Sequence, residues 1–278
     1  MSVLMQISDT HFGTEQPQVM AALTSLVKQQ KPNLVVLSGD ITQRAKPAQF
    51  QAARSFMDSL QVPFLAIPGN HDIPLLNLWS RLRNPYARHS AAFGAELEPV
   101  YSSRDMLVIC VNTTRAWRHR HGEVSASQIA RVADALSRAS AEQLRIVVVH
   151  QPIAVTRAAD AIHLLRGHAE ALTAWSAAGA DLVMGGHIHL PYVLPITGLA
   201  RPMWAVQAGT AVSSRVRSGV SNSVNILRWG TDAAVACCHI EQWDFSDKES
   251  NFRLAKLSTA NPQNRKFNLQ QNGSLQRS

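Results

Sequence analysis

Short apolar runs alternate with helical stretches over the first part of the chain. Residues 3–8, 34–37 and 64–67 are almost continuously apolar, as strands buried on both faces are. Between them, residues 17–30 and 47–60 repeat apolar side chains at helical spacing, and Pro47 stands in a first-turn position. This β-α-β-α-β alternation predicts parallel strands joined by right-handed crossovers.

A second block of the same kind follows an irregular or helical excursion at residues 73–97. Its predicted elements are a hairpin at 100–112, a helix from the Ser125–Gln128 capping box to about Ala139, a strand at 144–149, a helix at 161–178 and a strand at 181–184. From there to about Trp243 the chain is β-rich, with turns marked by Pro and Gly. Two such blocks predict an α/β fold, a four-layer α/β/β/α sandwich of two packed mixed β-sheets with flanking helices.

Composition indicates the domain boundaries and the cellular location. Of the 278 residues, 46% are hydrophobic and 17% charged, as in an ordinary globular protein. We expect one catalytic domain over residues 1–260 and a polar, basic, disordered tail at 261–278. No apolar stretch reaches the ~20 residues that cross a bilayer. The first seven residues resemble a core strand rather than a signal peptide, and the three cysteines form no disulfide framework, so a cytoplasmic location is expected.

The net charge of +8 allows two interpretations. A basic protein can bind nucleic acid, or it can be an enzyme that is basic around a phosphate-binding pocket and carries a basic tail. The charge is dispersed, apart from residues 81–83, 115–121 and the C-terminal end. This dispersion favours a small phosphoester partner over nucleic acid.

Seven side chains of metal-ligand type follow the apolar runs. They are Asp9, His11, Asp40, Asn70, His150, His187 and His189. Because the carboxyl ends of parallel strands meet at one edge of a sheet, these side chains are expected to converge on a pair of metal ions. Carboxylates, imidazoles and an amide, without a thiolate, suit Mn, Fe or Zn.

The order of the motifs resembles the calcineurin-like metallophosphoesterase superfamily. The matching motifs are Asp9-Thr-His11, Gly39-Asp40, Gly69-Asn-His-Asp72, the strand-end His150 and Gly186-His-Ile-His189. The resemblance covers roughly residues 5–190. Residues 209–215 look like the segment that completes the second sheet in the branch near the class III 3′,5′-cyclic nucleotide phosphodiesterases.

The resemblance implies a site for two divalent or mixed-valence ions bridged by Asp40. Asp9, His11 and His189 complete one ion's site, and Asn70, His150 and His187 complete the other. A water between two dications becomes a hydroxide near neutral pH and attacks phosphorus.

Other side chains are candidates for the remaining roles. His71 is the candidate general acid, and Asp72 either orients it, holds it protonated or is a plain turn residue. Arg44 and Arg215 are candidate substrate-binding residues, although Arg44 fits a solvated charge equally well. His163 and His168, five apart on the predicted helix, are expected at the surface.

These residues predict a dinuclear metal-dependent phosphoesterase, a phosphodiesterase with a 3′,5′-cyclic nucleotide as the first substrate candidate. Alternatives of the same superfamily are a nucleotide-sugar pyrophosphatase, such as UDP-2,3-diacylglucosamine hydrolase, and a nuclease. A non-enzymatic scaffold predicts missing ligands, and none is missing.

Overall fold

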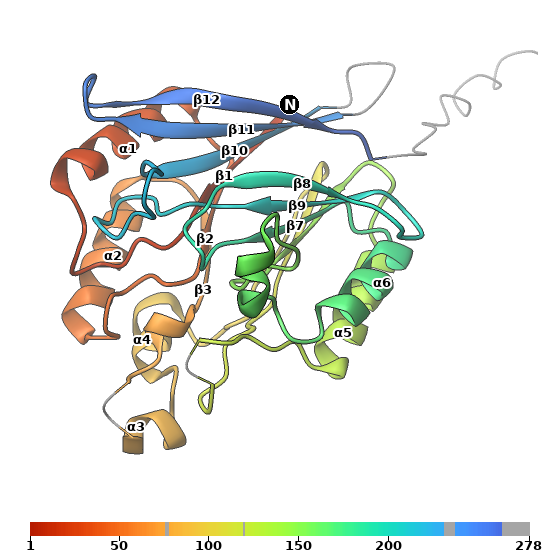
Figure 1. Ribbon diagram of the computed structural model, residues 1–278, viewed down its shortest axis with the longest axis horizontal. Coiled ribbons are helices and arrows are strands. Elements are labelled where there is room, and N and C mark those ends of the chain that lie inside the picture. Colours follow the sequence, from red (N-terminus) through yellow and green to blue (C-terminus); the bar gives the residue numbers. More distant parts are fainter. Residues whose placement is uncertain (76–77, 119, 231–236, 263–278) are drawn as a thin grey trace, which may run out of the picture.

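Two six-stranded β-sheets pack face to face, and helices cover their outer faces (Figure 1). The computed structural model describes residues 1–75, 78–118, 120–230 and 237–262. The strand order is β12-β11-β10-β1-β2-β3 in the first sheet and β4-β5-β6-β7-β9-β8 in the second. The predicted four-layer α/β/β/α sandwich is therefore confirmed.

The first sheet combines a parallel half and an antiparallel half. β1, β2 and β3 run parallel, while β10, β11 and β12 add antiparallel strands beside β1. The strands are β1 (Ser2–Ile7), β2 (Leu34–Ser38), β3 (Phe64–Ile67), β10 (Ser223–Gly230), β11 (Cys237–Ser246) and β12 (Asn251–Ala260). The prediction that the β-rich region ends near Trp243 was too short, because β11 and β12 form a hairpin beyond it.

The second sheet has a parallel centre and two antiparallel edges. β5, β6, β7 and β9 are parallel, and β4 and β8 flank them. The strands are β4 (Val100–Ser102), β5 (Met106–Cys110), β6 (Leu144–Val148), β7 (Leu182–Gly185), β8 (Tyr192–Ile196) and β9 (Met203–Gln207). β4 and β5 confirm the predicted hairpin.

The helices are α1 (Pro17–Gln30), α2 (Pro47–Ser59), α3 (Leu78–Arg83), α4 (Ala87–Phe93), α5 (Ala126–Ser137) and α6 (His168–Ala178), with 3-10 turns η1 (Asn70–Asp72) and η2 (Ala158–His163). The helix predicted at 161–178 is wrong over its first residues. Gly167 adopts a left-handed φ of 82°, which separates η2 from α6. Among the described residues, no helix combines the length and apolar character that crossing a membrane requires.

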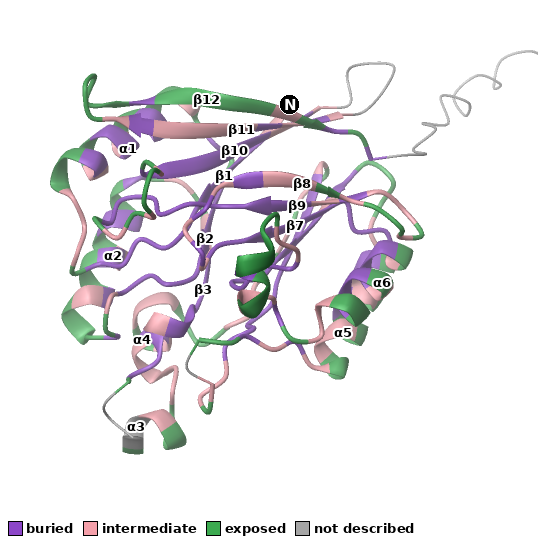
Figure 2. Cartoon of the chain, in the orientation of Figure 1, coloured by how far each residue is buried: buried purple, intermediate pink, exposed green. Residues whose placement is uncertain are grey.

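The central strands are largely buried (Figure 2), and their side chains alternate between two cores. Met5 of β1 packs with Leu23 of α1 on the helix side of the first sheet. Leu4, its neighbour, packs with Leu34 and Val148 between the two sheets. Burial on both faces explains why these strands are continuously apolar, and it holds their carboxyl ends rigidly in place.

The segment at residues 209–215 forms no strand of the second sheet, contrary to the expectation. It leads from β9 to β10, and therefore from the second sheet to the first. Its backbone bonds to the loop after β1, because Ala211 N donates to the Ser8 carbonyl at 3.0 Å and Val212 O accepts from Gln16 N at 2.8 Å.

The predicted C-terminal tail falls almost entirely on residues 263–278, outside the described residues. The domain boundary at residue 260 therefore stays a prediction.

The three cysteines are free thiols, as the absence of a disulfide framework in the sequence predicted. Cys110 and Cys238 are buried in strands, and Cys237 is partly buried.

Candidate metal centre

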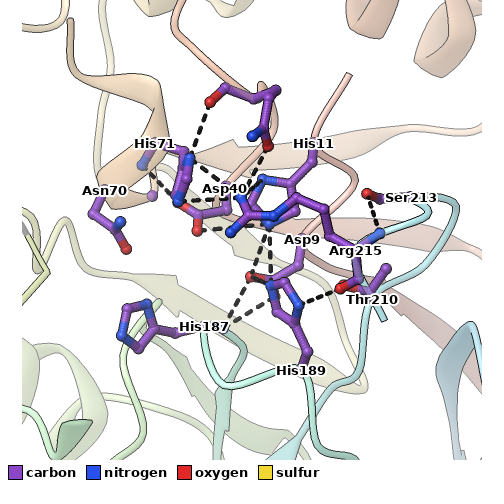
Figure 3. Close-up of polar contacts among 12 residues, drawn as sticks. Asp9, His11, Asp40, Asn70, His71, His187, His189, Thr210, Ser213 and Arg215 are labelled. Carbon is purple, nitrogen blue, oxygen red and sulfur yellow. Dashed lines mark hydrogen bonds and ion pairs between the residues drawn. The ribbon is translucent and has the colours of Figure 1, made fainter. Parts of the chain in front are cut away.

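The seven predicted ligands follow five strands and converge on one edge of the sandwich. Figure 3 labels them, apart from His150. Three groups of side chains each bring ligand atoms within 4.8 Å of one another. They are Asp9–His11–His189, Asp40–His150–His187 and His11–Asp40–His71. The loops after β1, β2 and β3 supply one part and the loops after β6 and β7 the other, so the site forms only when the two sheets pack together.

Asp40 lies between the two ligand clusters. Its Oδ1 is 3.2 Å from His150 Nε2, and its Oδ2 is 3.9 Å from His11 Nε2. In the first cluster His189 Nε2 lies 3.2 Å from Asp9 Oδ1. In the second, Asn70 Oδ1 lies 3.3 Å from His150 Nε2. A carboxylate in this position can contact ions on both sides.

Several ligands have backbone conformations that L-residues rarely adopt. The φ angles are 51° for Asp9, 43° for His11, 47° for Asp40, 73° for His187 and 52° for His189. Such conformations persist only where neighbouring contacts impose them, and they are typical of functional sites. Here His11 N donates to the Asp40 carbonyl at 3.0 Å, and His187 N donates to the Asp9 carboxylate at 3.0 Å.

Gly69 is required by the close approach of two of these loops. A Cβ at this position would overlap the Asp40 main-chain nitrogen and its carboxylate. The absence of a side chain therefore allows the loop after β3 to lie against the loop after β2.

Each of the two buried carboxylates lies beside a histidine that favours its ionised form. Burial alone would raise the pKa of Asp9, but His189 outweighs this effect and lowers it to about 2. Burial opposes ionisation of Asp40 too, and His150 holds the Asp40 pKa well below its usual value. Burial would lower the pKa of His150, yet Asp40 raises it to about 9. A cation bound between these carboxylates and histidines would favour the ionised carboxylates in the same way.

The remaining nitrogens also fit a pair of cations. Burial lowers the pKa of His11 and of His187 to about 3, so both rings are neutral, the form that binds metal. His11 Nε2 lies 3.0 Å from His189 Nε2. His187 Nδ1 is buried without a hydrogen-bond partner among the residues that the structure describes. A cation would resolve both features, and the N/O donor set suits Mn, Fe or Zn.

His71 lies beside Asp40 with its ring at the edge of the centre. Its main-chain N donates to Asp40 Oδ1 at 2.8 Å, and its Nδ1 lies 3.0 Å from the Gln43 carbonyl oxygen. The ring stands edge-on to His11, with centroids 4.8 Å apart. His71 therefore lies at the edge of the candidate metal centre, beside Asp40 and His11.

Orienting the His71 ring was one of three roles considered for Asp72, and its hydrogen bonds go to other groups. Its carboxylate accepts from Ile41 N at 3.0 Å, Thr42 N at 2.8 Å, Thr42 Oγ1 at 2.8 Å and Gly69 N at 2.8 Å. Burial, and then the charge of Asp40, raise its pKa to about 7, while the three backbone amides oppose that rise. Asp72 thus ties together the loops that carry Asp40 and Asn70.

A cavity of about 700 Å³ opens onto the centre. The arginines that line it, among the described residues, are Arg44, Arg120, Arg215 and Arg217. Arg215 contacts the candidate centre, with Nη1 2.9 Å from Gln43 Oε1, 3.3 Å from His71 Nε2 and 3.3 Å from His11 Nδ1. Arg44 is exposed on the rim. Both predicted substrate residues therefore face the cavity.

His163 was expected at the surface, and it is partly exposed. It also makes a contact that the sequence did not predict: it ends η2, lines the cavity, and places its Nδ1 3.3 Å from His187 Nε2. No spacing in the sequence marks this contact, because the two histidines are 24 positions apart and belong to different loops. His168, at the start of α6, bonds back to the Leu165 carbonyl instead.

A comparison of the sequence with protein families identifies the same family that the motifs, the fold and the ligand geometry indicate. The sequence model of the calcineurin-like phosphoesterase family matches residues 2–191. The chain belongs to this family. Calcineurin-like phosphoesterases use two divalent metal ions, and the protein is a phosphoric ester hydrolase of that kind.

Similar proteins of this family include two curated phosphodiesterases. A probable cyclic nucleotide phosphodiesterase of Synechococcus is 29% identical over 68% of this chain and 74% of its own length. The glycerophosphodiester phosphodiesterase GpdQ of Enterobacter lignolyticus is 38% identical, over 25% of this chain and 29% of its own.

Among solved structures, a dimetal phosphatase of Danio rerio has a TM-score of 0.68 at 12% identity. The alignment covers 94% of this chain and 99% of that one. The similarity supports the calcineurin-like phosphoesterase fold.

Proposed function

We propose that the chain hydrolyses a small phosphodiester at two metal ions, with a 3′,5′-cyclic nucleotide as the first candidate. Asp9, His11 and His189 would hold one ion, Asn70, His150 and His187 would hold the other, and Asp40 would serve both. When bound, the ions supply an acidified water as nucleophile and offset charge on the phosphoryl oxygens. The observation that carries the proposal is the position of Asp40, within 3.2 Å of His150 Nε2 and 3.9 Å of His11 Nε2.

His71 supplies the proton that the leaving group needs. Its Nδ1 is 3.0 Å from the Gln43 carbonyl oxygen, which only accepts hydrogen bonds, so Nδ1 carries a hydrogen. Nε2 is the nitrogen that would be protonated and pass its proton to the departing alkoxide, once Arg215 Nη1, 3.3 Å away, turns from it to the substrate. General acid catalysis of this kind contributes roughly 10²–10⁴-fold.

Arg215 and Arg44 bind anionic oxygens of the substrate. The Arg215 guanidinium is oriented by the Gln43 side chain at 2.9 Å and lies against His71, so it can contact a phosphoryl oxygen near the leaving group. The backbone of Arg215 also accepts a hydrogen bond from His189 Nδ1 at 2.6 Å. One residue thereby links the substrate to a metal ligand. Arg44, exposed on the rim, meets a more distant part of the molecule.

The choice of a diester is supported by relatives and by cavity size. A cavity of about 700 Å³ is in the range that holds a mononucleotide-sized ligand. The Synechococcus and Enterobacter relatives are both named as phosphodiesterases. A nucleotide-sugar pyrophosphatase and a nuclease would use the same centre, so they are competing outcomes of the test.

A turnover panel with Mn²⁺ tests the proposal. It compares 3′,5′-cyclic AMP and GMP, a glycerophosphodiester, a UDP-sugar and an oligonucleotide, with metal analysis of the purified protein. The expected result is two bound ions and the highest kcat/KM for a cyclic nucleotide. Preferred cleavage of the UDP-sugar, or steeply salt-dependent cleavage of the oligonucleotide, would contradict the substrate assignment. Failure to bind metal would contradict the whole proposal.

A further inference from the structure

We infer that His163 is a positioning residue for His187, whose ring it turns so that Nδ1 faces the metal site. The inference rests on the proposed function, because it takes His187 as a metal ligand. The relevant observation is a direct contact between side chains of two separate loops, with His163 Nδ1 3.3 Å from His187 Nε2.

Two other imidazoles of the centre are held by the main chain. His150 Nδ1 lies 2.9 Å from the Ser38 carbonyl oxygen, and His189 Nδ1 lies 2.6 Å from the Arg215 carbonyl oxygen. Each Nδ1 therefore carries a hydrogen, and Nε2 is left unprotonated for a metal. Both acceptors are main-chain carbonyl groups, so they remain when a side chain is substituted.

His187 has the opposite arrangement. Its Nδ1 is the buried nitrogen without a hydrogen-bond partner in the described part of the chain, and its Nε2 points to His163. If Nδ1 is to bind metal, the hydrogen must be on Nε2, and a neighbour must accept it. The His163 ring stands edge-on, with centroids 5.2 Å apart and planes at 66°. His163 Nδ1 is then the acceptor, and the His163 hydrogen is on Nε2.

A second contact holds the two loops in register. Arg217 Nη2 donates to Asp160 Oδ1 at 2.9 Å, and Arg217 Nη1 lies 3.4 Å from the Ile188 carbonyl oxygen. Asp160 is in η2, the turn that ends at His163, and Ile188 lies between the two ligands His187 and His189. Arg217 thus joins the turn that presents His163 to the loop that presents His187. The acceptor is fixed in place rather than carried on a free surface loop.

The test compares three substitutions of His163 by measuring affinity for Mn²⁺ in chelator competition. His163→Ala removes the acceptor and is expected to weaken the second ion about 10–100-fold, the usual effect of losing a partner of a ligand histidine. His163→Asn places its Oδ1 where Nδ1 stands and is expected to restore most of the affinity. His163→Gln places its polar group near the Nε2 position and is expected to resemble His163→Ala.

His168→Ala is the matched control, since His168 is on the next element and bonds to the Leu165 carbonyl. It is expected to bind metal like the wild type. Wild-type metal affinity in His163→Ala would overturn the inference. So would rescue by His163→Gln and not by His163→Asn, or a raised KM with unchanged metal affinity, because both would mean that His163 acts on the substrate through Nε2.

The same experiment separates this inference from the proposed function. Failure of the wild type to bind two ions would overturn the metal assignment and the role of His163 together. Two ions in the wild type with no effect of His163→Ala would overturn the role of His163 alone. Thermal unfolding of each variant shows whether a lost ion reflects lost structure, and the Asn variant then decides the outcome.

Discussion

Asp72→Asn is expected to destabilise the fold while leaving the chemistry of His71 intact. The Asp72 carboxylate accepts from Ile41 N, Thr42 N, Thr42 Oγ1 and Gly69 N at 2.8–3.0 Å. An amide offers one acceptor oxygen, and its NH₂ group must face at least one of these buried N–H groups. One or two buried donors left unsatisfied cost roughly 1–3 kcal/mol each, so the free energy of unfolding should fall by about 1–6 kcal/mol.

The assay is urea unfolding in EDTA, followed by tryptophan fluorescence, for Asp72→Asn and the wild type. Turnover is then measured at saturating Mn²⁺ under conditions where both proteins are folded. We expect kcat to stay within roughly threefold of the wild type, since the substitution removes no contact to the reacting atoms. Metal affinity should fall with stability, because Asp72 holds the loops of Asp40 and Asn70 together.

Asp58→Asn is the matched control. Its carboxylate pairs with Arg54 at 2.9 Å on the exposed side of α2, and its loss should change stability by less than about 0.5 kcal/mol. The reasoning is refuted if Asp72→Asn unfolds like the wild type yet loses tenfold or more in kcat at saturating metal. That combination would mean that Asp72 acts on His71 after all.

Three further outcomes test the centre and the fold. His71→Ala should keep both ions but lose about 10²–10⁴-fold in rate with an alkoxide leaving group. The loss should be much smaller with p-nitrophenolate, which leaves without a proton. Full activity toward the alkoxide ester would exclude His71 as the general acid. Asp40→Asn should lose bound metal and activity together, and retention of two ions by metal analysis would contradict the bridging role. Burial lowers the pKa of His89 from 6.5 to about 4, and neither ring nitrogen has a partner among the described residues. As the pH falls, the unfolded chain therefore binds a proton on His89 before the folded chain does. Between pH 7 and 5 the free energy of unfolding of the wild type, measured in urea, should fall by about 2 kcal/mol more than that of His89→Leu. Equal losses would disprove this account.

The candidate metal ligands could be picked out of the sequence because each one follows a buried strand. Asp9 after β1 and His150 after β6 are marked by largely apolar runs, and parallel strands bring their carboxyl ends to one edge. Asp72 illustrates the opposite case. It adjoins His71 in sequence, and adjacency favoured a contact between them, but its carboxylate turns toward the amides of Ile41 and Thr42.

The sequence by itself determined the reaction class, since the kinds of ligand and their order along the strands require only local pattern and the known geometry of parallel sheets. Tertiary structure alone decided which side chains surround those ligands. Arg215 reaches His71 across 144 positions, and His163 reaches His187 across 24. Contacts of this kind depend on how loops from two sheets pack, and such packing leaves no periodic signal in the chain. For that reason the chemistry could be predicted from residues, whereas the contacts that orient the ligands and face the substrate could not.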